Sequence, residues 1–130
     1  MSNANILFDH VHLVCRDPKV EAQWFIDKLG GEMGNNYEIH GAPQIHVHFE
    51  GATVIIRGQR TGESAGDQPG LQWGTDHFAF RVKNNFDAFC EGLMNNGVKF
   101  TMEPTQFNPS TKIAFIETPE GISIELVYKA

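Results

Sequence analysis

The first part of the chain alternates apolar and polar positions from Ile6 to Cys15, which predicts a half-buried strand with Val11, Leu13 and Cys15 on one face. A helix is expected from Pro18 to Leu29, because Asp17 suits the N-cap and proline suits the first helical position. The apolar residues of this segment recur at helical spacing and form one stripe: Ala22, Phe25, Ile26 and Leu29. The chain therefore begins with a strand and a helix that can pack on a sheet.

Three further strands are expected next: an edge strand around Tyr37 to Ile39, then Gln44 to Phe49 and Ala52 to Arg57. Glu50-Gly51 suits a two-residue hairpin turn between the last two. That turn fixes the cross-strand pairs as His48 with Thr53, Val47 with Val54, His46 with Ile55, Ile45 with Ile56, and Gln44 with Arg57. One face of this hairpin is then apolar and the other is mixed.

The segment from Gly58 to Gly74 is rich in Gly, Ser, Gln and charged residues and reads as a flexible connector. After it the order repeats, with a strand at Thr75 to Val82 and a helix that Asn84 or Asn85 is expected to cap. The apolar stripe of this helix is Phe86, Phe89, Cys90, Leu93 and Met94. Strands are then expected at Val98 to Met102, Lys112 to Glu117 and Ile122 to Tyr128, with a loop at Glu103 to Thr111.

The repeat of a strand, a helix and three strands predicts the fold class. We expect an α+β fold in which paired βαβββ modules form a curved eight-stranded mixed sheet, shaped as a cup, with the helices on its outer face. The chain is expected to be a single domain, residues 1–130, with module one at about 6–58, the connector at about 59–74 and module two at about 75–128.

The composition adds limits on partners and compartment. A net charge of −6 with scattered Lys and Arg argues against a nucleic-acid partner, and no apolar run approaches the length of a membrane span. No signal peptide is recognisable, so a soluble, cytoplasmic protein is expected. Cys15 and Cys90 fall at inward-facing positions and are expected to be small buried hydrophobes without a disulfide.

Three residues suggest a metal site. Asp9-His10 and Asp76-His77 stand at the heads of the two repeated strands, and Glu125 lies in the last strand among apolar neighbours. A carboxylate on an apolar face needs a partner, and two imidazoles with one carboxylate are a ligand set that leaves open positions on Fe(II) or a similar ion. We therefore expect His10, His77 and Glu125 to bind a divalent metal.

The sequence resembles the vicinal oxygen chelate superfamily, which includes glyoxalases, bleomycin-binding proteins and extradiol dioxygenases. The resemblance rests on Asp9 to Val14, on Leu29-Gly30-Gly31, on Asp76 to Phe80 and on Phe115 to Glu125. It implies that the two modules surround a metal held by His10, His77 and Glu125, donated partly in trans within a homodimer. Fe(II) or Mn(II) is the ion expected, with Zn(II) or Ni(II) as alternatives, and the substrate is a small molecule with adjacent oxygens.

The reaction is less well defined by the resemblance. Glyoxalases have a fourth ligand, Glu or Gln, in the strand that here reads Thr53 to Arg57 and offers none, so extradiol-dioxygenase-like chemistry is favoured. However, extradiol enzymes usually carry Tyr in place of Phe115, and an acid–base His where this chain has Gln106 and Phe107. The alternatives are a glyoxalase-like lyase or isomerase, a metal-free protein that binds a small ligand such as an antibiotic, and a vestigial site.

Further residues are candidates for contacts with substrate. His12 shares a face with His10 and could act as general base, or simply line a wet cavity. His46 and His48 form an H-x-H pair that either faces the substrate or forms a polar wall of the cavity. Phe115 is also expected to contact the substrate. Arg57 and Arg81 could hold an anionic group or be surface charges.

Overall fold

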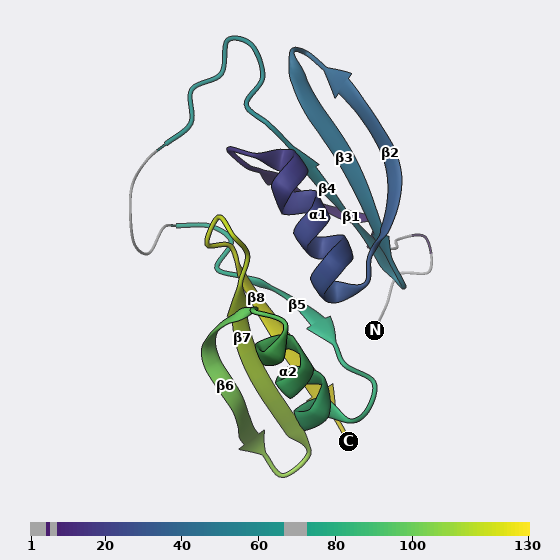
Figure 1. Cartoon of the computed structure of the whole chain (residues 1–130), viewed down its shortest axis with the longest axis vertical. Coiled ribbons are helices and arrows are strands. Elements are labelled where there is room, and N and C mark those ends of the chain that lie inside the picture. Colours follow the sequence, from purple (N-terminus) through teal and green to yellow (C-terminus); the bar gives the residue numbers. More distant parts are fainter. Residues whose placement is uncertain (1–4, 6–7, 67–72) are drawn as a thin grey trace. The chain divides into compact units, whose positions relative to one another are not determined.

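The computed structural model describes residues 5, 8–66 and 73–130, and the chain forms two compact units, residues 1–66 and 67–130. Each unit has the element order βαβββ (Figure 1). The first unit consists of β1 (His10–Val14), α1 (Pro18–Leu29), β2 (Glu32–Ile39), β3 (Ala42–Phe49) and β4 (Ala52–Arg57). The second consists of β5 (Phe78–Arg81), α2 (Phe86–Asn95), β6 (Lys99–Asn108), β7 (Thr111–Glu117) and β8 (Ser123–Lys129).

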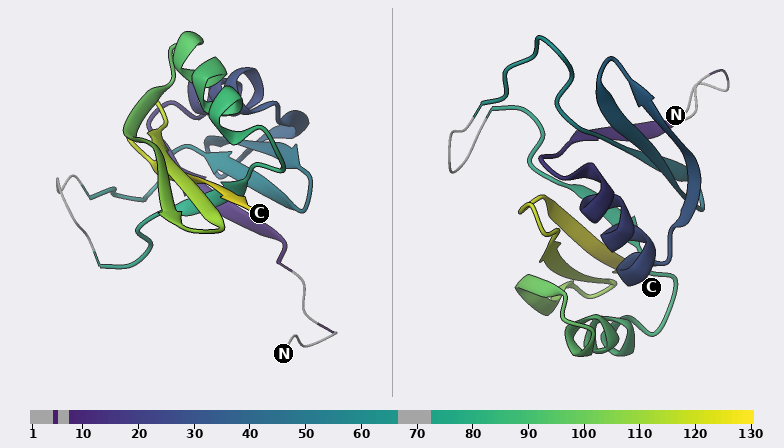
Figure 2. Two further views of the ribbon diagram at one scale, coloured as in Figure 1. Left: turned by 90° about the horizontal axis from the view of Figure 1, so that it is seen from below. Right: turned by 45° about the horizontal axis from the view of Figure 1, so that its top comes forward.

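Both units contain a four-stranded mixed sheet with the same topology. The strand order is β1-β4-β3-β2 in the first sheet and β5-β8-β7-β6 in the second. The first strand pairs in parallel with the last strand of its unit, and the other neighbours are antiparallel. One helix lies against each sheet, and the opposite face of each sheet is called its open face below (Figure 2). The expected α+β fold with paired βαβββ modules is confirmed, as two four-stranded sheets.

Helix α1 has the bounds that the sequence predicts, because both ends carry strong local signals. The Asp17 carboxylate accepts a hydrogen bond from the backbone N–H of Val20 at 3.2 Å, and Pro18 occupies the first turn. At the other end Gly30 adopts φ +77°, a left-handed conformation that glycine reaches without strain. Within α1 the side chains of Ala22 and Phe25 are fully buried, as the apolar stripe predicts. Glu21 is also fully buried, which the apolar pattern does not predict.

Helix α2 departs from its prediction at the N-terminus. Asn85, one of the two residues expected to cap the helix, occupies the N-cap position with φ +52°, but its side chain makes no capping hydrogen bond. Its amide instead donates to the Asn84 side chain at 3.2 Å. Phe86, Cys90 and Leu93 are buried as the stripe predicts, whereas Phe89 is exposed.

The strands agree with the sequence pattern where side chains alternate regularly. All five expected pairs of the β3–β4 hairpin are present. The expected loop at Glu103 to Thr111 is wrong for most of its length, because β6 continues to Asn108 and accommodates Pro104 through several shifts of register. Strand β2 begins earlier than predicted, at Glu32, and β5 begins only after His77. Of the expected first strand and connector, residues 6–7 and 67–72 lie outside the described residues.

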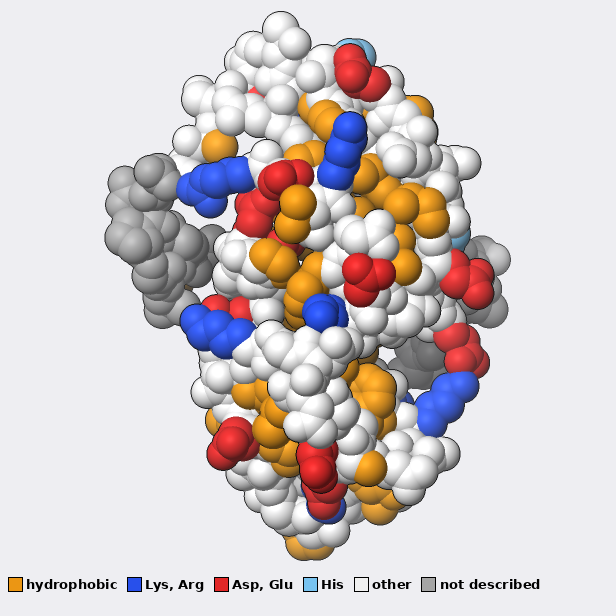
Figure 3. Space-filling view, in the orientation of Figure 1, with side chains coloured by type: hydrophobic (Ala, Val, Ile, Leu, Met, Phe, Trp, Pro, Cys, Tyr) orange, Lys and Arg blue, Asp and Glu red, His pale blue; other side chains and the backbone are white. Residues whose placement is uncertain are grey.

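Apolar side chains between helix and sheet make up the core of each unit. In the first unit Ile45, Val47 and Ile56 are buried, and in the second Ile116, Ile124 and Leu126 are buried. Cys15 and Cys90 are buried, as expected, and form no disulfide within the described part of the chain; burial raises the pKa of the Cys90 thiol to about 11. No helix within the described part of the chain is long and apolar enough to cross a membrane. On the face drawn in Figure 3, Lys and Arg side chains are interspersed with Asp and Glu.

Candidate metal centre

In the second unit His77 lies between two carboxylates. Its Nδ1 is 2.7 Å from Asp76 Oδ2, and its Nε2 is 3.0 Å from Glu125 Oε1. Asp76 is the preceding residue, whereas Glu125 comes from the middle of β8, opposite Ala79 of β5 and Phe115 of β7. The second unit thus joins two of the predicted metal ligands, His77 and Glu125, from opposite ends of its sequence.

Both ligand candidates remain accessible at the open face of the sheet. The His77 side chain is 30% exposed and that of Glu125 is 19% exposed. Phe115 packs edge-on against the imidazole, with 5.0 Å between ring centroids and 83° between ring planes. The aromatic ring therefore restrains the orientation of His77 without covering it.

The two carboxylates determine the protonation of His77. The hydrogen bond to Asp76 raises the pKa of His77 above its ordinary value, and the hydrogen bond to Glu125 adds to this, while burial opposes it. A histidine that donates Nδ1–H to a carboxylate presents Nε2 for other bonds, an arrangement common around metal-binding histidines. Such binding requires the Nε2 proton to leave first.

The donor atoms of His77 and Glu125 suit a divalent cation. Two neighbouring ligands of one ion, each about 2.1 Å from it and at right angles, lie about 3 Å apart. The 3.0 Å between His77 Nε2 and Glu125 Oε1 matches this separation. Within residues 5, 8–66 and 73–130, no group of three or more His, Cys, Asp or Glu side chains is arranged to hold a metal ion. The second unit therefore supplies a pair of donors, and a third must be added to it.

An open pocket of about 570 Å³ lies beside Glu125, on the same sheet face. Its lining includes Arg81, which the sequence singles out, and also Phe107 and Lys129, which it does not. The prolines near Phe107 predict a loop, whereas its position in β6 brings this side chain to the pocket. Lys129 could have been found from the alternation of β8, because it follows Glu125 on the same face.

In the first unit His10 repeats the local geometry of His77. Its Nδ1 is 2.7 Å from Asp9 Oδ2, and its side chain is 38% exposed. Its ring centroid lies 5.9 Å from that of His12. His12 lies opposite Ile55 of β4, as Ala79 lies opposite Glu125 of β8. Ile55 therefore stands at the position of the first unit that corresponds to Glu125.

Within the described part of the chain, no hydrogen bond joins His12, His46 or His48 to a carboxylate. Burial lowers the pKa of His12 below its ordinary value, and the charges of Arg57, His10, Arg60 and His46 lower it further. Burial also lowers the pKa of His46, followed by the charges of His48 and His10. Both imidazoles are therefore neutral near pH 7, and a neutral His12 has the protonation state that a general base needs.

His46 and His48 are neighbours on the open face of the first sheet. Their ring centroids are 6.3 Å apart, and His46 also lies 6.0 Å from Tyr37. His48 Nδ1 is 2.9 Å from Thr53 Oγ1, whereas His46 Nε2 is buried without a hydrogen-bond partner in the described part of the chain. A buried nitrogen of this kind is available to a ligand at no cost in existing hydrogen bonds.

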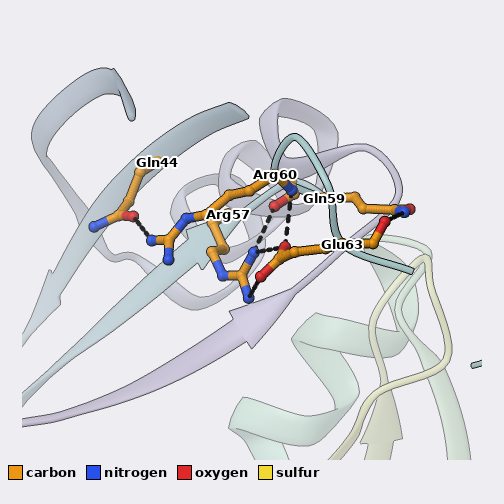
Figure 4. Close-up of polar contacts among 6 residues, drawn as sticks. Gln44, Arg57, Gln59, Arg60 and Glu63 are labelled. Carbon is orange, nitrogen blue, oxygen red and sulfur yellow. Dashed lines mark hydrogen bonds and ion pairs between the residues drawn. The ribbon is translucent and has the colours of Figure 1, made fainter. Parts of the chain in front are cut away.

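Arg57 is held by an acidic residue of the connector. Its guanidinium donates to both carboxylate oxygens of Glu63, at 2.5 and 3.1 Å, as drawn in Figure 4. Glu63 also accepts from the backbone N–H of Arg60 at 2.8 Å, and Arg60 donates to Gln44 at 2.7 Å. An anion at Arg57 must therefore compete with Glu63. This partner could not be predicted, because the connector has no regular sequence pattern.

The structure has two βαβββ units, and in the second a histidine lies beside a glutamate of the last strand. Comparison with known proteins identifies the family. Residues 7–126 match the sequence model of the Glyoxalase/Bleomycin resistance protein/Dioxygenase superfamily. The chain belongs to this superfamily. Many of its members are enzymes, and divalent metals are common among them, but others are not enzymes. No curated protein matches the sequence.

Solved structures of this superfamily share the fold. A glyoxylase/bleomycin resistance protein/dioxygenase domain from Frankia sp. EAN1pec is 21% identical, with a TM-score of 0.77 over 99% of this chain and 94% of that one. A glyoxalase family protein from Bacillus cereus is 19% identical, with a TM-score of 0.78 over 98% and 96%. Oxidase ChaP-H2 is 22% identical, with a TM-score of 0.68 over 96% and 94%.

Proposed function

We propose that this protein is a divalent-metal-dependent enzyme that acts on a small molecule with adjacent oxygens, with chemistry of the extradiol-dioxygenase type. The observation that carries the proposal is the 3.0 Å separation of His77 Nε2 and Glu125 Oε1 on an accessible sheet face. His10 is the third ligand of the proposal, because it repeats the Asp-His pair and because family members place a ligand there. Fe(II) or Mn(II) is the proposed ion.

The protein's own residues have separate tasks in this proposal. Asp76 holds His77 by its Nδ1 hydrogen, so that Nε2 faces Glu125. Phe115 packs edge-on against His77 and limits the orientations of its ring. His12, with its lowered pKa, accepts a proton from the substrate as general base. A bound metal would act as a Lewis acid and as a template for the two substrate oxygens.

The first unit favours oxygenase chemistry over a glyoxalase-like reaction. Ile55, which corresponds to Glu125, is 7% exposed and cannot act as a ligand. A three-ligand site leaves more open positions for substrate and dioxygen than a four-ligand site. One structural relative is named as an oxidase, which agrees with this choice without deciding it.

Metal analysis tests the proposal. Purified protein reconstituted anaerobically with Fe(II) or Mn(II) and then desalted is expected to retain one ion per site, and His77→Ala and Glu125→Ala are expected to lose it. His48→Ala is the matched control, since it removes an imidazole of the open face outside the ligand set. Absence of stoichiometric metal, or unchanged metal content in His77→Ala, contradicts the proposal and favours a metal-free binding protein or a vestigial site.

The proposal includes a homodimer, and mixing of variants tests whether ligands are shared between copies. The His10→Ala and His77→Ala proteins are each expected to bind no metal on their own. If ligands come from two chains, a dimer of one copy of each contains one intact site, so the mixture regains about half of the sites in the mixed dimers. No recovery in a mixture shown to exchange subunits indicates that each chain supplies all its own ligands.

A further inference from the structure

The pocket of the second unit combines apolar and cationic side chains, and binding of a metal by His77 and Glu125 does not require either kind. Its walls come from β5, β6, β7 and β8, on the open face of the sheet. Ala79, Ile113 and Val127 form its apolar floor. Phe107 also lines it and is 68% exposed, although burial of a phenyl ring is favourable by about 2 kcal/mol. An apolar ligand body would cover this ring.

Two cationic side chains line the same pocket without an acidic partner. Neither Arg81 nor Lys129 forms an ion pair or side-chain hydrogen bond with any residue that the structure describes. Lys99 and Lys112 of the same unit, by contrast, pair with Glu117 at 3.0 Å and with Asp87 at 2.9 Å. Among these four cationic side chains, the two without an acidic partner in the described residues are the two that line the pocket.

The negative charge in the pocket is already engaged. Glu125 is the single carboxylate among the lining residues, and it faces His77 at 3.0 Å. Two cations without an acidic partner among the described residues, against one engaged carboxylate, leave the pocket with a surplus of positive charge. A bound anion would meet charge-assisted donors from Arg81 and Lys129, which form the stronger class of hydrogen bond.

The strand register gives the distance between the cations and Glu125. Arg81 lies opposite Val127, which follows Glu125 by two residues, and Lys129 follows it by four. At about 3.3 Å per residue, these positions lie about 7 and 13 Å along β8 from Glu125. A molecule with its reacting end at Glu125 and a charged group at its far end would therefore span roughly the length of a ring with a short side chain.

We propose that this pocket binds a carboxylate-bearing small molecule with an apolar or aromatic body. Its carboxylate pairs with Arg81 and Lys129, and its body lies over Ile113 and Val127 against Phe107. The inference rests on the proposed function in taking the end near Glu125 as the reacting end. It narrows the substrate class to anionic molecules and gives Arg81, Lys129 and Phe107 the role of specificity-determining residues.

Binding of matched probes tests this charge preference. The probes are 3-phenylpropanoate and 3-phenylpropanamide, which differ in charge but hardly in shape, titrated into chelator-treated protein and followed by heteronuclear NMR. The carboxylate is expected to bind about tenfold more tightly than the amide, with shifts at the pocket residues. Arg81→Gln and Lys129→Gln are each expected to weaken carboxylate binding about fivefold or more and to leave amide binding unchanged.

Lys99→Gln is the matched control, because it removes a lysine of the same unit outside the pocket and should change neither affinity. Equal binding of carboxylate and amide, or no saturable binding of the carboxylate up to about 10 mM, overturns the proposal. A preference for the carboxylate that stays near tenfold in both pocket variants also overturns it. Because the experiment uses metal-free protein, its failure leaves the metal-content test intact, and failure of the metal-content test leaves this charge preference measurable.

Discussion

The two units have the same topology and the same register among their three inner strands, yet their open faces carry different chemistry. In the second, the row Ala79, Glu125 and Phe115 places a carboxylate beside His77. In the first, the corresponding row is His12, Ile55 and His46, with an apolar side chain in the middle. One fold thus carries either a His–Glu donor pair or a histidine-rich surface, because the side chains differ at all three positions of this row.

The comparison also explains the protonation of the histidines. His77 has two carboxylate hydrogen-bond partners, which raise its pKa, whereas burial, together with cationic or imidazole neighbours, lowers the pKa values of His12 and His46. The two units therefore differ in the direction in which the pKa values of these histidines are shifted.

The largest effect is expected from Ile55→Glu, which copies the arrangement of the second unit into the first. Without metal the variant should lose about 3 kcal/mol of unfolding free energy, because apolar burial is lost and a carboxylate is buried. Mn(II) should restore part of this loss, since the new carboxylate stands near His10 and His12. Urea denaturation with and without Mn(II) measures both effects.

Ile55→Met is the control for that experiment, because it keeps an apolar side chain of similar volume and should cost less than about 1.5 kcal/mol. Equal stabilisation of both variants by Mn(II), or equal stability without it, would show that position 55 does not correspond to Glu125 in function.

Asp76→Asn tests the orienting role of the carboxylate behind His77. The amide keeps the shape of the side chain but removes its charge, so metal affinity is expected to fall about 10–100-fold. Competition with a fluorescent chelator gives the affinity. Asp87→Asn, which alters an exposed ion pair on α2, should leave the affinity unchanged. An unchanged affinity in Asp76→Asn would remove Asp76 from the site.

The histidine pKa values should divide by unit. In metal-free protein, NMR titration is expected to place the midpoint of His77 above the ordinary value of about 6.5 and those of His12 and His46 below it. His77 then stabilises the fold at pH below about 6.5, and this contribution is lost as pH rises through its folded pKa. The contributions of His12 and His46 are present above about 6.5 and are lost as pH falls through their folded pKa values. Midpoints in the reverse order would contradict the contacts described for both faces.

The smallest effect concerns the helix caps. Asp17→Ala should cost about 1 kcal/mol of unfolding free energy, because it removes the hydrogen bond to the Val20 N–H. Asn85→Gly should change stability by less than about 0.5 kcal/mol, because Asn85 makes no capping bond and glycine adopts its φ of +52° readily. Thermal unfolding measures both, and a larger loss from Asn85→Gly would reverse this contrast between α1 and α2.

Sequence reasoning succeeded where a local signal dominates. The bounds of α1 follow from Asp17, Pro18 and Gly30, and the β3–β4 register follows from the Glu50-Gly51 turn. It failed where a strand tolerates residues that usually break strands, as β6 does with Pro104. In consequence it missed Phe107 as a pocket residue, because the pattern placed that side chain in a loop.

The candidate site was predictable only in part. The repeated Asp-His pair and the isolated Glu125 pointed to residues that the fold does bring together, His77 and Glu125. Contacts made through irregular segments were not predictable, and the pairing of Arg57 with Glu63 is the main example. The roles of His10, His12, His46 and His48 remain predictions, because side-chain types alone do not determine which partners they meet.

The most direct test of the central claim is a crystal structure of the Mn(II)-loaded protein with anomalous diffraction data. The account predicts one anomalous peak about 2.0–2.3 Å from both His77 Nε2 and a Glu125 carboxylate oxygen, with His10 of the same or a second copy as third ligand. A peak between His46 and His48 instead, or Mn(II)-soaked crystals without a peak at His77 and Glu125, would contradict it.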